Sequence, residues 1–341
     1  GQPTVYFTHQ PPPATIMGCS RSMPRKRSHI RIPMKKTTRA KVDVSITAFG
    51  KPFMTAVTIS SLLKYSGKHI DKIYLTLERV QPYQANFDFI KQRLSNKLIL
   101  HTPFFFFGLK PAQKSLLWFP SYRKSIRYQY SFEESKSDYL FVAHNDVLFH
   151  KDIIGHFLQE LHSENFVGVG PIGQCWNCPA NTASYCSGDD YEKYQPNWEK
   201  FWKLCEETPS PRKQYYAQFI QNKRVWPLPE CRLNEWSALI HLKSIRHLVK
   251  KPYKLTPFGQ MNLDIGTKWF SDLNHLGYRF KNCPIEGYGT HVWTGKVGES
   301  NSGLDTQNNF QLYQRAEREA YTMLINEFGY SPSDLYSNYM F

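Results

Sequence analysis

The sequence has no acidic residue before Asp43, although nine lysines and arginines lie between Arg21 and Lys41. Part of the formal net charge of +15 therefore belongs to an N-terminal arm, residues 1–41, rather than to the rest of the chain. Prolines and cations without acids are typical of a solvated, flexible segment. Such an arm binds nucleic acid, an anionic membrane surface or nothing, and we expect it to take no part in chemistry.

Long hydrophobic runs are also missing. The aromatic run at residues 104–107 is far too short to span a bilayer, and the N-terminus lacks the apolar core of a signal peptide. The seven cysteines are an odd number in a long chain, which favours a reducing compartment over a disulfide framework. We therefore expect a cytoplasmic protein whose contact with a membrane, if any, is peripheral.

The sequence shows no internal repeats, but from residue 42 short apolar runs alternate with longer mixed segments. Strands are predicted at 42–47, 70–77, 97–101, 139–143, 166–169 and 236–241, and helices at 55–65, 87–94, 122–134, 152–162, 264–276 and 310–328. This alternation predicts an α/β domain with a mostly parallel central sheet and helices on both faces.

Ligands of such sheets bind beyond the carboxyl ends of the strands. Applied to this chain, that rule selects Thr47 and Phe49 after the first strand, Glu78 after the second, and the pair Asn145 and Asp146 after a buried strand at 139–143. Asp146 stands between two apolar runs, where a carboxylate is costly unless something neutralises it. A divalent cation is one solution, and a helix cap or a salt bridge is the other.

Two residues later in the chain are also candidates for the site, one as a general base and one as a metal ligand. Asp264 is predicted to open a helix, where an acid is either an ordinary cap or a general base. His291 follows a glycine-rich turn after the last predicted strand, and a histidine on such a loop is either structural or a late metal ligand.

The order of these features along the chain, from the first strand through Glu78, Asp146 and Asp264 to His291, resembles that of the inverting GT-A glycosyltransferases of glycosyltransferase family 2. Asp146 matches the last acid of the family's Asp-x-Asp metal motif, Asp264 matches the base of its Glu-Asp motif, and His291 matches a histidine that completes the metal site. Glu78 matches an acid near the nucleobase or ribose. His144 and Leu263 depart from the two motifs, because the family has acids at those positions.

The resemblance implies a GT-A fold and a metal-dependent inverting glycosyltransferase. A Mn²⁺ or Mg²⁺ ion would hold a nucleotide-diphosphate-sugar donor, and Asp264 would deprotonate a hydroxyl of a glycan or another acceptor. A retaining glycosyltransferase of the same fold remains an alternative, and so does a nucleic-acid-binding protein that uses the basic arm. We expect no nucleic acid, because acids at strand ends would repel phosphates. A nucleotidyltransferase is disfavoured, since one glycine, Gly50, follows the first strand.

Residues 173–235 interrupt the alternation and hold five of the seven cysteines. Cys175 and Cys178 form a C-x2-C knuckle, and with Cys186 and Cys231 they provide enough thiols for a structural zinc, with Cys205 as a further candidate. A second knuckle is absent, and free buried cysteines are the alternative. The predicted organisation is therefore an arm at 1–41, a GT-A domain at 42–300 with this cysteine-rich insert, and a helical extension at 301–341.

Overall fold

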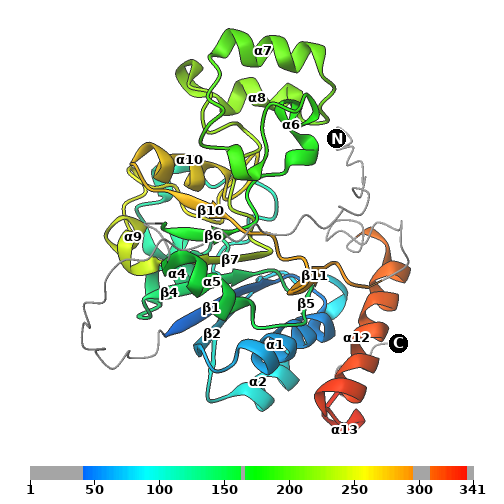
Figure 1. Cartoon of the computed structure of the whole chain (residues 1–341). Coiled ribbons are helices and arrows are strands. Elements are labelled where there is room, and N and C mark those ends of the chain that lie inside the picture. The colour runs from blue at the N-terminus through cyan, green and yellow to red at the C-terminus, as the bar shows by residue number, and fades with distance from the viewer. Residues whose placement is uncertain (1–40, 163–165, 295–307, 336–341) are drawn as a thin grey trace, which may run out of the picture.

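The structure is a computed structural model that describes residues 41–162, 166–294 and 308–335 (Figure 1). The predicted basic arm, except Lys41, lies outside these residues, and so does part of the predicted C-terminal extension. No helix among the described residues is both long enough and apolar enough to cross a bilayer.

A seven-stranded sheet lies at the centre of the molecule (Figure 1). Its strands are, in spatial order, β10 (Phe280–Asn282), β6 (Gly168–Gly170), β7 (Ser237–Ile240), β4 (Tyr139–Ala143), β1 (Val42–Ala48), β2 (Ile70–Leu77) and β3 (Leu98–His101). Strand β7 runs antiparallel to both of its neighbours, and the other neighbouring strands are parallel. The predicted α/β class with a mostly parallel sheet is confirmed.

Two small antiparallel sheets accompany the central one. They pair β5 (Val147–Phe149) with β11 (Gly289–His291), and β8 (Met261–Asn262) with β9 (Asp264–Ile265). The α-helices are α1 (Pro52–Ser66), α2 (Asp88–Leu94), α3 (Pro120–Arg123), α4 (Gln129–Glu134), α5 (Ile153–His162), α6 (Pro179–Thr182), α7 (Trp198–Glu207), α8 (Lys213–Phe219), α9 (Leu242–Val249), α10 (Thr267–His275), α12 (Phe310–Phe328) and α13 (Pro332–Leu335). Short 3-10 helices occupy Pro82–Gln84, Lys114–Leu116, Cys175–Asn177, Gly188–Asp190 and Gln221–Lys223.

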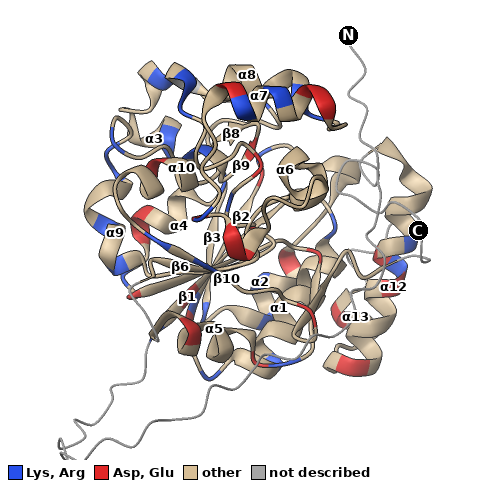
Figure 2. Cartoon of the chain, turned by 45° about the horizontal axis from the view of Figure 1, so that its top comes forward, with Lys and Arg blue, Asp and Glu red and all other residues tan. Residues whose placement is uncertain are grey.

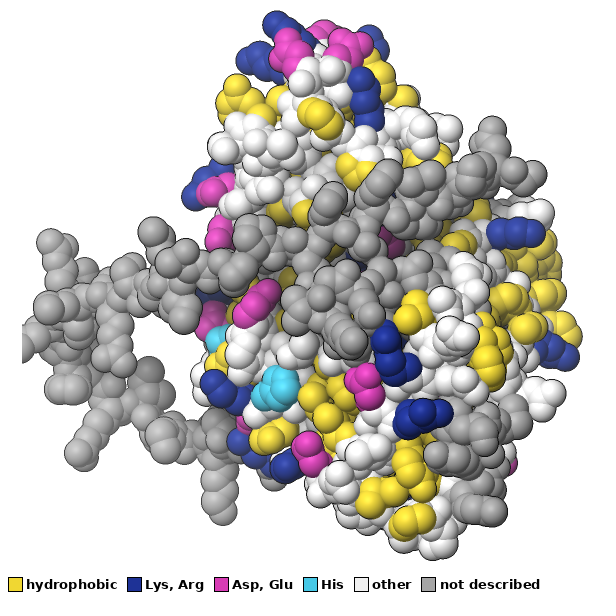
Figure 3. All heavy atoms as spheres, turned by 90° about the vertical axis from the view of Figure 1, so that its right-hand side faces the viewer, with side chains coloured by type: hydrophobic (Ala, Val, Ile, Leu, Met, Phe, Trp, Pro, Cys, Tyr) yellow, Lys and Arg dark blue, Asp and Glu magenta, His cyan; other side chains and the backbone are white. Residues whose placement is uncertain are grey.

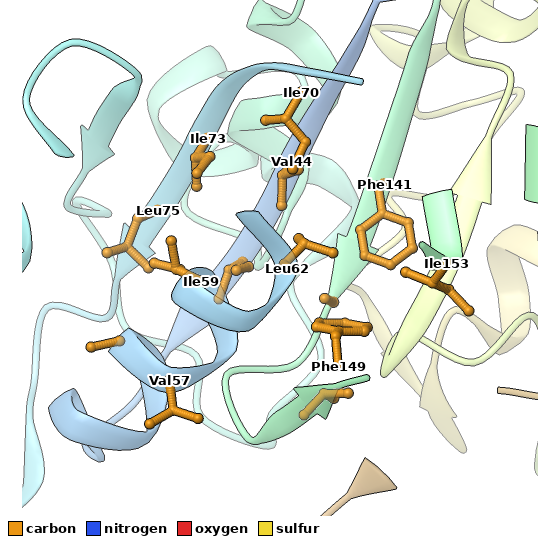
Figure 4. Close-up of a cluster of buried hydrophobic side chains, with 14 of the residues drawn as sticks. Val44, Val57, Ile59, Leu62, Ile70, Ile73, Leu75, Phe141, Phe149 and Ile153 are labelled. Atoms are coloured by element: carbon orange, nitrogen blue, oxygen red, sulfur yellow. The ribbon is translucent and has the colours of Figure 1, made fainter. Parts of the chain in front are cut away.

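Helices cover both faces of the sheet, as predicted, because successive strand residues point to opposite sides. In β4, Phe141 and Ala143 belong to a core shared with α1, α5 and α12, whereas Leu140 and Val142 belong to a second core shared with α4, α9 and α10. Figure 4 shows the first core, where Leu62 of α1 lies over the sheet. The strands are therefore buried on both sides, which explains their continuous apolar runs.

Helix α1 begins at Pro52, three residues before the predicted start, because proline suits the first position of a helix. The predicted helix at 122–134 is two helices, α3 and α4, separated by Tyr128, which adopts a left-handed conformation with φ 66°. The predicted helix at 264–276 was wrong at its start, since α10 begins at Thr267 after Gly266 with φ 81°. Asp264 therefore lies in strand β9 and does not open a helix.

The chain between β6 and β7 forms a separate group of helices, α6, α7 and α8, at the top of Figure 1. Helix α12, which has the predicted bounds, lies along α1 at the other end of the molecule. Acidic, basic and hydrophobic side chains are mixed on the face that carries α12 (Figure 3).

Candidate functional site

The carboxyl ends of β1 and β4 meet at the point where the strand order reverses. From β1 the chain continues to β2 on one side, and from β3 it returns to β4 on the other side of β1. Ligands of open α/β sheets bind in the crevice at such a switch point. The segments that follow these two strands are therefore the first place to look for a site.

Three metal-ligating side chains converge there. His144 and Asp146 follow β4, and His291 ends β11, which pairs with β5 in the register His291 opposite Val147. The Val292 N–H also donates to the Asp146 carbonyl at 3.0 Å. The strand pairing thus brings a residue 145 positions further along the chain beside Asp146, and one ligand atom from each of the three side chains lies within 4.8 Å of the others.

The distances in this cluster show which atoms face one another. His144 Nδ1 is 3.1 Å from His291 Nε2 and 3.7 Å from Asp146 Oδ1, and His291 Nε2 is 3.4 Å from the same carboxylate oxygen. Asp146 Oδ1 is fully buried and accepts no hydrogen bond from the described residues. A buried acceptor without a donor is costly, so this oxygen and the two ring nitrogens suit a bound cation.

A second layer orients His144. Its Nε2 lies 3.1 Å from Glu235 Oε1, which leaves Nδ1 to face Asp146 and His291. Glu235 is itself paired with the guanidinium of Arg232. A histidine that donates one ring N–H to a carboxylate has the tautomer and the orientation that a metal ligand requires.

Lys51 contacts the other oxygen of the Asp146 carboxylate. Its ammonium is 3.1 Å from Asp146 Oδ2, and both side chains are buried. Burial alone would raise the pKa of Asp146, but the Lys51 ammonium and the imidazoles of His291 and His144 hold that pKa well below its usual range. Lys51 therefore keeps the carboxylate ionised and turns Oδ1 toward the histidines. Burial lowers the pKa of His291 despite Asp146, which favours the neutral, metal-binding imidazole.

Helix α12 holds the turn that carries Lys51. Gly50 and Lys51 both have positive φ, 67° and 56°, a conformation that is unfavourable for lysine. The Lys51 N–H donates to the Tyr313 hydroxyl at 3.0 Å. The buried Glu317 carboxylate accepts the N–H groups of Phe53 and Met54, at 2.9 and 3.0 Å, in the first turn of α1. The C-terminal helix thus supplies the cap that the N-terminus of α1 lacks in its own sequence.

Asp264 lies in a neighbouring network of charges. Its Oδ2 is 3.0 Å from Arg212 Nη1, 3.0 Å from Gln174 Nε2 and 3.4 Å from Arg232 Nη2. Because Arg232 also pairs with Glu235, salt bridges and hydrogen bonds connect Asp264 to His144. Two guanidinium groups, and not the N-terminus of a helix, compensate the charge of this carboxylate. Among the described residues, its Oδ1 accepts only the adjacent Ile265 N–H, at 2.9 Å.

The other predicted donor-site residues lie around the same edge. Asn145 Nδ2 donates to Thr55 Oγ1 at 3.0 Å and to the Gly50 carbonyl at 3.3 Å, so its amide supports the turn before Lys51. The Thr47 hydroxyl is buried without a hydrogen-bond partner in the described chain. Phe49 stacks on Phe106, with ring centroids 5.6 Å apart.

Glu78 is buried at the end of β2, and its Oε1 is 2.9 Å from Arg127 Nε. Burial raises the pKa of Glu78 although Arg127 opposes the change. The neighbouring cations Arg123 and Lys124 form salt bridges with Glu133 and Glu134 of α4. Their role is structural.

The thiols of Cys175, Cys178, Cys186 and Cys231 lie near one another without forming the predicted zinc site. Among the described residues, the one group of three or more candidate ligands is His144, Asp146 and His291. The cysteines, Cys205 included, are free, and burial raises the pKa of each thiol. The four-thiolate zinc hypothesis is therefore not supported by the geometry, because no three of these sulfurs come within ligand distance of one another.

Sequence reasoning missed several residues of the site. His144 departs from the family motif, and its place as a candidate ligand becomes visible only when the turn between β4 and β5 brings its ring beside Asp146 and His291. Lys51 was overlooked, because no local pattern reveals that a lysine after β1 will be buried beside an acid after β4. Tyr313 and Glu317 stand more than 260 positions from the turn they hold.

Comparison with known proteins adds little to this description. No family model matches the sequence, and no curated protein matches it. Among solved structures, the mannosyltransferase PcManGT from Pyrobaculum calidifontis, in complex with GDP-Man and Mn²⁺, is 10% identical with a TM-score of 0.41, and the match covers 88% of this chain and 68% of that one.

The glucosyl-3-phosphoglycerate synthase from Mycobacterium tuberculosis, in complex with Mn²⁺, UDP and phosphoglyceric acid, is 11% identical with a TM-score of 0.39, covering 86% of this chain and 80% of that one. The bifunctional WbbM, in its apo form, is 11% identical with a TM-score of 0.37, covering 74% of this chain and 40% of that one. At these identities and TM-scores the likenesses carry no information on the substrate or the reaction of this chain.

Proposed function

We propose that the protein is a metal-dependent glycosyltransferase that moves a sugar from a nucleotide-diphosphate-sugar to an acceptor hydroxyl with inversion of configuration. The observation that carries the proposal is the group of His144, Asp146 and His291 at the switch point of the sheet, with a buried Asp146 oxygen that no described donor satisfies. A nucleic-acid-binding role is not favoured, since this edge gathers carboxylates.

His144 Nδ1, Asp146 Oδ1 and His291 Nε2 would hold the ion. Two imidazoles and one carboxylate suit Mn²⁺ better than Mg²⁺, which prefers oxygen ligands and keeps much of its water. When bound, the ion stabilises the negative charge that develops on the diphosphate as it leaves. Lys51 fixes the position of Asp146 and adds a second positive charge to this edge.

Polar groups around the ion suit the rest of a nucleotide donor. The indole N–H groups of Trp236 and Trp293 are buried without a partner among the described residues, and the Trp236 ring packs on His291 with centroids 4.7 Å apart. Donors of this kind are suited to phosphate oxygens. Thr47, Phe49, Glu78 and Asn145 remain the candidates for the nucleoside side of the site.

Asp264 remains the proposed base. Arg212 and Arg232 contact its Oδ2 from one side, which leaves Oδ1 to accept the proton of an incoming hydroxyl. Glu235 is the competing acid, but its two oxygens already contact His144 and Arg232. Attack by the deprotonated oxygen on the face opposite the diphosphate inverts the anomeric carbon.

The test is a panel of nucleotide-sugars incubated with the protein and Mn²⁺, with release of nucleoside diphosphate and the product's anomeric configuration as readouts. We expect turnover of at least one donor and an inverted product. Thermal stabilisation by oligonucleotides, without stabilisation by nucleoside diphosphates and Mn²⁺, would reject the enzyme. A product with retained configuration would reject the direct displacement and leave the metal site in place.

A further inference from the structure

Seven of the fourteen exposed large hydrophobic side chains in the described residues come from two short segments. They are Phe104, Phe105, Phe106, Leu109, Trp118 and Phe119 between β3 and α3, and Tyr253 after α9. The rings of Trp118 and Tyr253 stack at 5.3 Å, so the two segments form one surface, which we call the aromatic patch. An exposed apolar patch of this kind usually marks a binding surface.

The patch is held in place by the fold. The N–H groups of Phe104 and Phe105 both donate to Ser125 Oγ at 3.0 Å. Beneath the loop, Leu117 and Ile126 form a small core of their own with Ala112, Phe107 and Tyr122. The backbone therefore holds these side chains at the surface, where 39–64% of each residue remains exposed, and a partner is the physical reason to keep them there.

Positive charge surrounds the patch. Residues 89–132 and 236–263, which contain the two segments, have no aspartate or glutamate. Lys110 and Lys114 are exposed within the first segment, and Lys250 and Lys254 flank Tyr253. Figure 2 shows the basic stretches around α3 and α9 on one side of the molecule. The partner must therefore be both apolar and anionic.

We propose that the aromatic patch docks the protein on an anionic phospholipid membrane. Aromatic rings partition to the boundary between headgroups and acyl chains, and exposed lysines are attracted to anionic headgroups. A carbohydrate partner fits less well, because sugar hydroxyls require polar partners, and five of the seven residues of the patch are phenylalanine or leucine, with polar atoms only on the side chains of Trp118 and Tyr253. None of the residues of the patch belongs to the basic arm at residues 1–41.

The patch reaches the candidate site through Phe106, which stacks on Phe49 at the end of β1. Docking would therefore bring the rim of the crevice to the membrane surface. This part of the inference rests on the proposed function: the acceptor of the transferred sugar is then a hydroxyl of a membrane lipid rather than a hydroxyl of a free sugar.

The test is sedimentation of the full chain with two kinds of vesicle, phosphatidylcholine alone and phosphatidylcholine with 30% phosphatidylserine (about three lipids in ten, an anionic surface). The main variant combines Phe104→Ser, Trp118→Ser and Phe119→Ser. The matched control combines Tyr185→Ser and Tyr215→Ser. These substitutions remove exposed aromatic rings from the group of helices between β6 and β7, which we call the helical lobe. A second variant, Lys110→Glu with Lys114→Glu, tests the charge.

We expect wild-type protein to bind the phosphatidylserine vesicles, the triple variant to bind about tenfold more weakly or worse, and the control to bind normally. The lysine variant should lose about tenfold or more at low salt. Equal partitioning of the triple variant and wild type would overturn the proposal and assign any binding to the arm. Absence of wild-type binding, with ring fluorescence responding to oligosaccharides, would identify a carbohydrate surface instead.

A separate measurement, thermal stabilisation by Mn²⁺ and a nucleoside diphosphate, tests the proposed function. Phe104, Trp118 and Phe119 are not among the residues proposed to bind the metal or the nucleotide, so stabilisation by Mn²⁺ with UDP or GDP should be unchanged by the triple substitution. Vesicle binding without any nucleotide response would keep the membrane surface and reject the glycosyltransferase. Stabilisation by nucleotide in protein that does not bind vesicles would keep the proposed glycosyltransferase and reject the membrane surface.

Discussion

Two regions of this chain have sequences typical of metal sites, and the fold brings three candidate ligands together in one of them. At the sheet edge, His144, Asp146 and His291 come together, with Lys51 behind the carboxylate. In the helical lobe, the C-x2-C knuckle of Cys175 and Cys178 has no third sulfur within ligand distance among the described residues. The ligands at the edge are placed by strands paired over long distances, whereas those in the lobe depend on local spacing alone.

The contrast concerns what fixes a ligand in space. Pairing of β11 with β5 leaves His291 little freedom, because its register opposite Val147 determines where its ring lies. The knuckle cysteines sit in short helices and turns, and no second knuckle faces them. Strand ends are therefore better guides to a site in this chain than cysteine spacing is.

The largest effect should come from Asp146. Asp146→Asn removes the anionic ligand but keeps an oxygen near Lys51, and we expect metal affinity to fall by more than about a hundredfold and transfer to be lost. Asp146→Ala is a poorer test of the metal site. It leaves the buried Lys51 ammonium unpaired, which lowers the free energy of unfolding by about 3–5 kcal/mol. Normal sugar transfer by Asp146→Asn at limiting metal would show that the sheet edge, like the cysteine knuckle, is not a metal site.

The next effect concerns the base. Asp264→Asn keeps the shape of the side chain and removes the proton acceptor, so we expect transfer to fall by about two to four orders of magnitude while donor binding survives. Donor affinity and single-turnover transfer are measured on the same sample. Normal transfer by Asp264→Asn, together with an inactive Glu235→Gln, would move the base to Glu235.

A smaller effect should appear at Glu317, which anchors the turn of Lys51. Burial raises the pKa of Glu317 from 4.5 to about 7 although the N–H groups of Phe53 and Met54 and the Lys51 charge oppose it. Between these two pH values the folded state binds a proton that the unfolded state has lost. The free energy of unfolding should therefore fall as pH rises through this window, by about 3 kcal/mol in total.

Glu317→Gln should abolish that part of the pH dependence, measured by denaturant unfolding at pH 5 and pH 8. Glu327→Gln, at an exposed position of the same helix, is the matched control and should follow wild type. Parallel pH profiles for wild type and Glu317→Gln would show that Glu317 does not titrate in this range.

The smallest effect is expected from the lobe. Cys175→Ser with Cys178→Ser should leave transfer unchanged and lower stability by about 1–3 kcal/mol, the usual effect of a substitution in a packed region. Elemental analysis of protein purified without added metal should find less than about a tenth of an equivalent of zinc in wild type. One equivalent of zinc, lost in this variant, would mean that the lobe is a metal site after all.

The fold was largely predictable because its strands are short apolar runs that end at polar residues, as Tyr139–Ala143 does before His144. Boundaries failed where single backbone angles decide them, at Tyr128 and at Gly266. The convergence of Asp146 and His291 was predictable from the strand that precedes Asp146 and from the glycine-rich turn that precedes His291 after the last predicted strand. Lys51 and Glu317 were not, because their roles exist only once β4 and α12 pack beside the turn after β1.

The central claim is that one divalent ion binds at His144, Asp146 and His291. Titration with Mn²⁺, followed by electron paramagnetic resonance with and without UDP or GDP, tests it most directly. We predict one Mn²⁺ per chain, bound more tightly with a nucleoside diphosphate, lost in Asp146→Asn and His291→Ala, and kept in the Cys175→Ser, Cys178→Ser variant. Absence of binding by wild type, or equal binding by the Asp146 and His291 variants, would contradict the account.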